Sequence, residues 1–184
     1  LLAVFLVVGG AQAGPNQSPR LNLAVSPGIS GTVSTSDGRV RCASGCRIPY
    51  RRGTLLTLRA KAAPHYLFDR WFGDCIGVAP ICTIALDRDI AATARFVGEP
   101  VQLALSVGGP GKVTSDPPGI DCGGDHYLCS LEVPYGSRVT LTPAPDNSGR
   151  FAGWDGPCAA AGTGPCDVIA QPTATAAAFG HASP

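Results

Sequence analysis

Two stretches of the sequence share one pattern of aromatic residues, glycine and cysteine: FDRWFGDC at residues 68–75 and FAGWDGPC at residues 151–158. Both follow the pattern F-x-x-W-x-G-x-C, and they contain the only two tryptophans of the chain, Trp71 and Trp154. A block this distinctive that occurs twice indicates an internal repeat, and the repeat organises the remaining sequence.

The similarity extends outward from these two blocks over most of the chain. Residues 21–42 align with residues 101–122 without a gap, and both copies close on a phenylalanine, Phe96 or Phe179. Between these points, a Pro-Tyr pair and a Thr-Leu pair also occur in both copies. The chain therefore consists of two copies of one unit.

These limits define two modules and a short joint. Module one covers residues 21–97, module two covers residues 101–180, and the sequence Gly-Glu-Pro at 98–100 joins them. Because the joint is so short, we expect the modules to meet end to end with limited freedom, as a segment of a rod.

Within each module, apolar residues alternate with polar or small residues over short runs. Leu21, Leu23 and Val25 do so in module one, and Val139 and Leu141 do so in module two. Period-2 alternation interrupted by Gly and Pro is typical of antiparallel strands. The predicted fold is all-β: two tandem small antiparallel modules, sandwich-like or β-grasp-like.

Turns are predicted where Asp, Pro and Gly cluster between these runs, at residues 36–38, 87–89 and 116–119. The alanine-rich segment 174–178 is compatible with helix or strand. Its alignment with the end of module one favours a closing strand.

The chain has eight cysteines, all after residue 40 and all in close pairs. The four spans are Cys42–Cys46, Cys75–Cys82, Cys122–Cys129 and Cys158–Cys166. Four cysteines in a module allow three connectivities. The second cysteine of each span shifts with its own loop yet remains present, which favours a disulfide within each span. The alternative is a zinc site, but the usual C-x-x-C knuckle is absent.

Disulfides would compensate for the small size of each module. A domain of about 80 residues buries a small core and is marginally stable. Each closed loop of this length should contribute roughly 2–3 kcal/mol by constraining the unfolded chain.

The first thirteen residues indicate export. Leu1 to Val8 is an uninterrupted apolar run, and Ala11-Gln12-Ala13 resembles a signal-peptide cleavage site. The run is shorter than the ~20 apolar residues that a transmembrane helix needs. We interpret residues 1–13 as a signal-peptide remnant and 14–20 as a linker, and expect a secreted protein, extracellular or periplasmic, with no transmembrane segment in the mature chain. The alternative is a buried N-terminal strand.

Taken together, these features resemble the divergent internalin-B B-repeat, a bacterial surface-protein repeat. The resemblance rests on the opening strand with Gly-x-x-Gly-x-Val, the Pro-Tyr and Thr-Leu pairs, the F-x-x-W-x-G-x-C block and the closing Phe. It covers nearly all of residues 21–180. It implies a small β-rich module used in arrays on exported proteins, for display, adhesion or spacing, and it brings no catalytic residues.

Two features suggest binding. The first is charge: module one has ten Lys/Arg and five Asp/Glu, whereas module two has three and seven. Five arginines crowd around the first cysteine span: Arg39, Arg41, Arg47, Arg51 and Arg52. They suggest a site for a polyanion, such as an acidic glycan or cell-envelope polymer. The alternative is a solvated strand face, or a contact with acidic module two of a neighbouring copy.

The second feature is the aromatic residues. Trp71 and Trp154 occupy one position of the repeat, as do Tyr50 and Tyr135. Such residues either pack in a core against a disulfide or form a stacking platform for sugars. The sequence predicts core positions for the tryptophans, and exposure is the observation that decides between the two interpretations.

Catalytic and metal sites are not expected. The three histidines, His65, His126 and His181, lie at unmatched places in the repeat, and no G-x-S-x-G motif accompanies them. Asp121 and Asp125 lie near His126 within one cysteine span, but the spacing does not fit a calcium-binding EF-hand loop. We therefore expect no enzyme activity, no metal and no cofactor.

The net charge of the whole chain is +1, which gives no indication of a nucleic-acid partner. The leading functional hypothesis is a non-catalytic structural or interaction module of the cell surface, a spacer or weak adhesin. The alternative is a carbohydrate- or polyanion-binding module.

Overall fold

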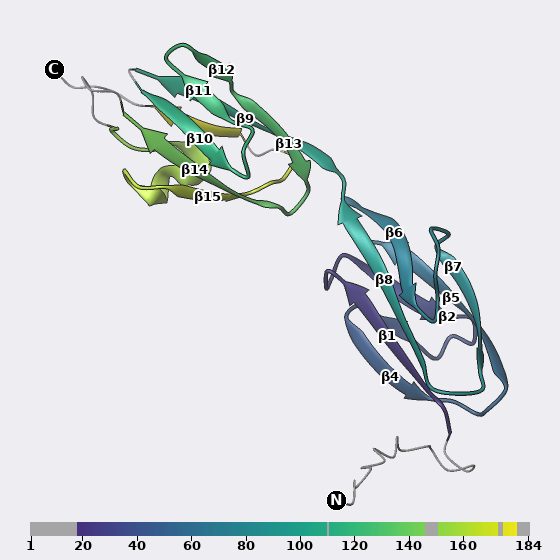
Figure 1. Cartoon of the computed structure of the whole chain (residues 1–184). Coiled ribbons are helices and arrows are strands. Elements are labelled where there is room, and N and C mark those ends of the chain that lie inside the picture. The colour runs from purple at the N-terminus through teal and green to yellow at the C-terminus, as the bar shows by residue number, and fades with distance from the viewer. Residues whose placement is uncertain (1–17, 110, 146–150, 173–174, 180–184) are drawn as a thin grey trace, which may run out of the picture.

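The structure is a computed structural model that describes residues 18–109, 111–145, 151–172 and 175–179. It contains two β modules that follow one another along the chain and lie end to end (Figure 1). Each module has its own hydrophobic core, and the two cores share no residue.

Module one is a sandwich of two four-stranded sheets, with strand orders β4-β1-β8-β6 and β3-β2-β5-β7. Its strands are β1 (Arg20–Ser26), β2 (Gly31–Thr35), β3 (Arg41–Cys42), β4 (Gly45–Pro49), β5 (Thr54–Ala62), β6 (Tyr66–Gly73), β7 (Ile81–Leu86) and β8 (Ile90–Gly98). Alternate residues of the strands are buried, as in β1 with Leu21, Leu23 and Val25. These side chains meet Leu58 and other inward residues of the facing sheet in one cluster.

Module two has a three-stranded sheet, β13-β9-β16, and a five-stranded sheet, β12-β11-β10-β14-β15. Its elements are β9 (Pro100–Gly108), β10 (Lys112–Asp116), β11 (Asp121–Gly123), β12 (His126–Leu128), β13 (Ser130–Pro134), β14 (Arg138–Ala144), the 3-10 helix η1 (Gly156–Ala161), β15 (Cys166–Ile169) and β16 (Thr175–Phe179). The strand β12 has no counterpart in module one, because the cysteine span that contains it is longer.

The structure confirms the all-β fold and selects the sandwich of the two predicted architectures. The predicted turns at 36–38 and 87–89 each lie between two strands, and the turn predicted at 116–119 begins at Asp116, the last residue of β10, and leads to β11. The closing segment of module two is a strand over Thr175–Phe179. Residue 174, where the predicted segment begins, lies outside the described residues.

One strand pair in each module departs from the antiparallel prediction. In module one, the first and last strands, β1 and β8, are parallel neighbours, with register from Leu21↔Ile90 to Ser26↔Arg95. In module two, β9 and β16 pair in the same way. The alternation of apolar residues predicts strands but carries no information on their direction, so it did not distinguish this pairing. A chain with parallel first and last strands enters a module at one pole and leaves at the other, which places the modules end to end.

The predicted signal remnant at residues 1–13 lies outside the described residues. Of the predicted linker, residues 18–20 are described, and Pro19 is buried. The carbonyl oxygen of Pro19 accepts a hydrogen bond from the N–H of Tyr50, so the end of this linker is part of module one. In the part of the chain that the structure describes, no helix has the length and apolar character to cross a membrane.

Candidate functional site

The two tryptophans are core residues that hold a disulfide-closed loop. Trp71 is 2% exposed and Trp154 is 5% exposed. The indole N–H of Trp71 donates to the carbonyl oxygen of Ala79 at 3.0 Å, and that of Trp154 donates to Gly164 at 2.7 Å. Each accepting carbonyl lies within the loop that Cys75–Cys82 or Cys158–Cys166 closes. The tryptophans are therefore structural, as the sequence predicted.

The glycine of the first block is required by a close backbone approach. Gly73 has a φ of +90°, which favours glycine. A Cβ atom at this position would lie 2.3 Å from the carbonyl oxygen of Ala91 on β8. The aromatic ring, the glycine and the cysteine of the block thus serve one local purpose: they turn the chain out of β6 into the closed loop.

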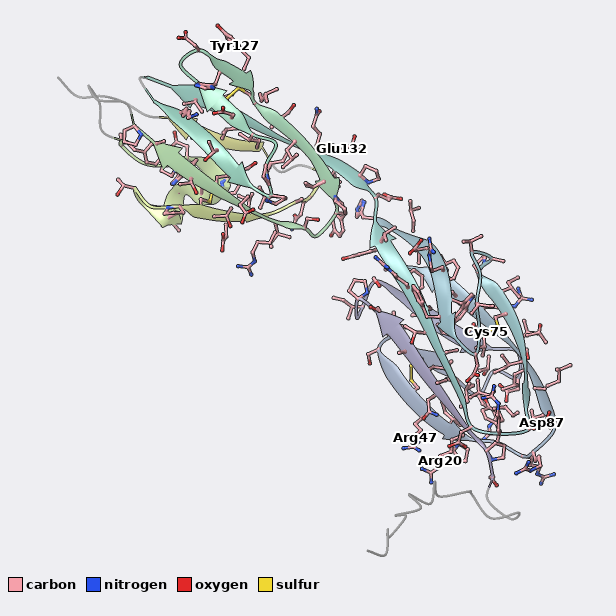
Figure 2. All side chains as sticks on the ribbon, in the orientation of Figure 1. Arg20, Arg47, Cys75, Asp87, Tyr127 and Glu132 are labelled. Carbon is pink, nitrogen blue, oxygen red and sulfur yellow. A yellow bond between two sulfur atoms is a disulfide. The ribbon has the colours of Figure 1, made fainter. Side chains whose placement is uncertain are left out.

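The burial of the aromatic residues contradicts the sugar-stacking hypothesis. Besides the tryptophans, Tyr50 is 4% exposed, and the cationic group of Arg39 lies 4.7 Å above its ring. Tyr135 is half-buried and its ring contacts His65 and Tyr66 of module one. None of these rings offers an open face to a sugar. Among the described residues, the exposed aromatic side chains include Tyr127 on the β11–β12 hairpin, at 84% (Figure 2), and Phe72 on β6, at 43%.

Each of the four cysteine spans contains a disulfide, and in module one the two disulfides connect the sheets at opposite edges. Cys42 of edge strand β3 bonds to Cys46 of edge strand β4. At the other side, Cys75 follows β6 and bonds to Cys82 of β7, the remaining two edge strands. The disulfides thus join the sandwich along both of its open sides.

The structure divides the five arginines of the predicted basic cluster among three places. Arg47 lies on β4, in the outer part of one sheet, near the pole of module one that is farthest from module two (Figure 2). Arg41 lies on β3, in the other sheet. The remaining three occupy turns, one between β2 and β3 and two between β4 and β5: Arg39, Arg51 and Arg52.

The turn that holds Arg39 also contains the carboxylate of Asp37, and the turn that holds Arg51 and Arg52 lies against the acidic turn 87–89. Arg39 follows Asp37, and its backbone N–H donates to that carboxylate at 3.2 Å. Arg52 donates to the carbonyl oxygen of Asp87 at 2.6 Å, next to Asp89 in the following turn. We name this surface the far pole: the turns 36–40, 50–53 and 87–89. Positive and negative charges are mixed there.

A more uniform basic surface lies on the solvent-exposed side of the sheet β3-β2-β5-β7. We name this side the outer face. Because burial alternates along these strands, Arg41 points outward from β3, and Arg59 and Lys61 point outward from β5. The sequence cluster included Arg41 but missed Arg59 and Lys61. Their spacing carried a signal that was not used: residues two positions apart share a face wherever the chain forms a strand.

Asp74 anchors the closed loop after β6 to β8. The guanidinium of Arg88 donates to Oδ1 of Asp74 at 2.7 Å, and the N–H of Ala91 donates to Oδ2 at 2.7 Å. Both hydrogen bonds favour the carboxylate, so they lower the pKa of Asp74 below its ordinary value.

We expect Asp74→Asn to destabilise module one at neutral pH and to have a vanishing effect in acid. A lowered pKa means that the stability from this carboxylate is present above the unfolded-state pKa and is lost as pH falls through the folded-state pKa. Urea unfolding midpoints between pH 7 and pH 2 measure this difference. The control is Asp125→Asn, at an exposed position of module two. If the difference in urea midpoint between wild type and Asp74→Asn stayed constant with pH, the Asp74 carboxylate would not be the source of the stability.

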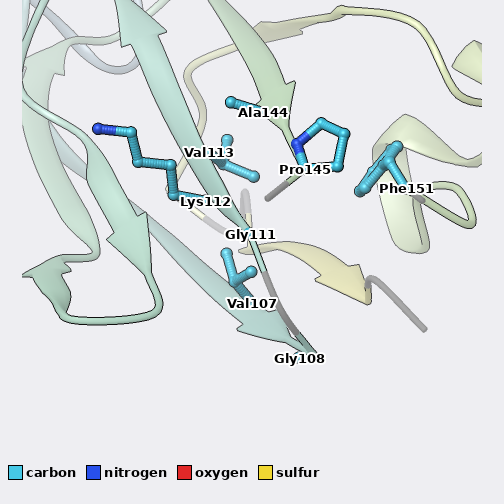
Figure 3. A pocket seen from close by; sticks show the side chains of 8 residues that line it. All are labelled: Val107, Gly108, Gly111, Lys112, Val113, Ala144, Pro145 and Phe151. Carbon is cyan, nitrogen blue, oxygen red and sulfur yellow. The ribbon is translucent and has the colours of Figure 1, made fainter. Parts of the chain in front are cut away.

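Module two has a small hollow and a charged cluster on its five-stranded sheet. A hollow beside β10 in module two has apolar walls and a volume of about 10 Å³, too small for more than one water molecule (Figure 3). On the same sheet, Asp121 lies between Lys112, at 3.1 Å, and His126, at 2.8 Å. Among the described residues, no group of three or more His, Cys, Asp or Glu side chains could hold a metal ion.

Comparison with known proteins identifies module one. Residues 21–100 match the family model of the divergent InlB B-repeat domain. This match, which covers less than half of the chain, supports one repeat domain of this type over module one and the joint, and no catalytic family is indicated. The repeat type and the four disulfides are consistent with an extracellular location. No curated protein matches the sequence significantly.

The solved structures that match this chain include two bacterial proteins. The TIE protein of Bacillus anthracis matches with a TM-score of 0.38 and 7% identity, over 89% of this chain and 33% of that chain. GBS52, the minor pilin of the Gram-positive pathogen Streptococcus agalactiae, matches with a TM-score of 0.32 and 8% identity, over 91% of this chain and 98% of that chain. The chain thus spans about a third of the length of the TIE protein.

Proposed function

We propose that this chain is a non-catalytic, exported spacer that holds its two modules in a fixed end-to-end arrangement at the bacterial cell surface. In this proposal, module two is a second copy of the same repeat, and residues 1–13 are the remains of the signal that directs export. The observation that carries the proposal is the junction between the modules, which is bonded on both sides.

The backbone of Glu99 connects both modules directly. Its N–H donates to the carbonyl oxygen of His65 in module one at 2.8 Å. Its carbonyl oxygen accepts from the N–H of Tyr135 in module two at 2.8 Å. Strand β8 therefore continues into β9 with one intervening residue, and this residue is held in place from both sides.

Aromatic side chains fill the space beside this connection. The ring of Tyr135 lies 4.9 Å from that of His65 and 5.4 Å from that of Tyr66, the latter in an edge-to-face arrangement. Edge-to-face aromatic pairs contribute about 0.5–1.5 kcal/mol beyond the area that they bury. A short joint, two backbone hydrogen bonds and packed rings together favour a stiff connection over a flexible linker.

The proposal predicts that the two modules tumble as one body and that Gly98→Ala separates their motions. A Cβ atom at Gly98 would lie 2.3 Å from the carbonyl oxygen of Tyr135, so alanine forces the modules apart at the junction. Backbone ¹⁵N relaxation measures the effect: wild type should give one rotational correlation time for both modules, whereas Gly98→Ala should give two shorter ones.

The matched control is Gly45→Ala on β4. A Cβ atom there would have no neighbour within 4 Å, so the same chemical change should leave the tumbling unaltered. Wild-type modules that tumble independently would refute the spacer proposal, whatever the variants do.

A further inference from the structure

We propose that the outer face of module one binds a linear acidic glycan through Arg41, Arg59 and Lys61. The partner is a polysaccharide chain that carries carboxylate, phosphate or sulfate groups. This inference goes beyond the spacer role and does not depend on it, because a flexible pair of modules would present the same face.

The three cations form a triangle on one flat surface. In the register of the sheet, Arg41 on β3 lies opposite Ser34 on β2, and Ser34 lies opposite Arg59 on β5. Two strand spacings separate Arg41 from Arg59, about 10 Å, and two residues along β5 separate Arg59 from Lys61, about 7 Å. Charges at these distances suit a series of anionic groups on one extended chain better than one compact anion.

No carboxylate neutralises this triangle within the sheet. The four strands β2, β3, β5 and β7 contain no Asp or Glu. Among the described residues, none of the three cations forms an ion pair or a side-chain hydrogen bond, whereas Arg70, Arg88 and Arg95 of the same module all pair with aspartates. Unpaired cations on a β face attract an anionic polymer without first having to release an internal partner.

The face also has a hollow between two of its cations. It has a volume of about 370 Å³ and opens at the end of the outer face nearest module two, where Arg41, Lys61 and Thr32 border a largely apolar lining that includes Ile29 and Pro64. Further along the face, Thr57 and Thr83 bring their hydroxyl oxygens within 3.4 Å of each other. Cations interspersed with hydroxyl groups provide hydrogen-bond partners for the hydroxyl groups of a glycan, besides its charges.

Module two shows that this surface is specific to module one. In the repeat alignment, Arg41 corresponds to Asp121, Arg59 to Thr142 and Lys61 to Ala144. In the corresponding sheet of module two, Asp116 is exposed at the end of β10, whereas the other two acidic strand residues are paired: Asp121 contacts Lys112 and His126, and Asp167 contacts Arg138. Because these two carboxylates already have partners, the sheet of module two is a poor complement for the outer face, which argues against a second copy of the chain as the occupant.

Binding of the full oxidised chain to two acidic polymers tests the proposal. The probes are polygalacturonate, which supplies carboxylates, and dextran sulfate, which supplies sulfates, with uncharged dextran as the reference. The test variant is Arg41→Ser/Arg59→Ser/Lys61→Ser. The matched control is Arg39→Ser/Arg51→Ser/Arg52→Ser, which removes the same charge from the far pole.

We expect the outer-face variant to bind at least one acidic polymer roughly 100-fold more weakly at low ionic strength, since each cation near an anionic surface contributes about a factor of five. The far-pole variant should retain most of the affinity, and wild-type binding should weaken as salt screens the charges. Unchanged thermal melting of both variants verifies that they fold.

Three results would overturn the proposal. The first is equal binding by wild type and the outer-face variant, and the second is an equal loss in both variants, which would reduce the effect to net charge. The third is self-association of the wild type, measured by sedimentation, that is absent in the outer-face variant. The outer face would then bind a second copy of the chain. Independent tumbling of the modules, by contrast, bears only on the spacer role.

Discussion

Replacing Trp71 with alanine is expected to lower the free energy of unfolding of module one by about 3–5 kcal/mol, the usual cost of truncating a large core aromatic residue. The indole is buried and packs against Phe68, with ring centroids 5.6 Å apart. Its loss also leaves the carbonyl oxygen of Ala79 without its hydrogen bond. A small domain has only about 5–15 kcal/mol of stability, so this single change should remove a large part of it.

Each module contains one tryptophan, so the unfolding of the two modules can be followed separately. In Trp71→Ala, Trp154 is the remaining tryptophan, so its fluorescence reports on module two, while circular dichroism follows the whole chain. We expect module two to unfold as in wild type and the module-one transition to move to a lower urea concentration. Trp154→Ala should give the reverse.

Ile76→Ala is the control for side-chain truncation in the same region. Ile76 lies inside the loop of Cys75–Cys82 but is 84% exposed, so its loss should change stability little. A similar effect of Trp71→Ala and Ile76→Ala would contradict the core role of the tryptophan and reopen the question of a surface role.

Removing both disulfides of module one is the second change with a large expected effect. The loops are short, with sequence separations of 4 and 7 residues. The chain-entropy relation gives about 2 kcal/mol for each bond, or about 4 kcal/mol for the module. The two bonds lie at opposite edges of the sandwich, so each also restrains a separate pair of edge strands.

Two double variants separate the contributions: Cys42→Ala/Cys46→Ala and Cys75→Ala/Cys82→Ala. Each should shift the urea midpoint of module one by about the same amount, and the combined variant should shift it by the sum, because the bonds lie at opposite edges. Module two retains its own disulfides and should keep its midpoint. A combined variant as stable as wild type would show that the core alone holds the sandwich.

Much of this architecture could be predicted from local patterns. The F-x-x-W-x-G-x-C block predicted two modules, and the alternation of residues such as Leu21 and Leu23 predicted strands. The structure gives the block its physical meaning, since ring, glycine and cysteine act within one loop. Local patterns succeed where the responsible contacts are near in sequence.

The features that escaped prediction depend on contacts between distant segments. The parallel pairing of β1 with β8 joins residues about seventy positions apart, and the sequence of neither strand indicates which strand pairs with it. The basic surface was missed in part for the same reason. Arg41 and Arg59 are eighteen positions apart in the sequence, yet only β2 separates their strands. The predicted cluster instead consisted of arginines that are close in sequence, which the fold distributes over two strands and two turns.

The parallel pairing also determines how the molecule bears tension. Because β1 and β8 lie side by side and carry the two ends of module one, a pull along the long axis slides them past each other. The six residue pairs from Leu21↔Ile90 to Ser26↔Arg95 are then loaded in shear and resist together, instead of peeling apart one after another. Strands β9 and β16 place module two under the same geometry. Force transmitted lengthwise through this pair of modules therefore loads the terminal strand pair of each sandwich in shear.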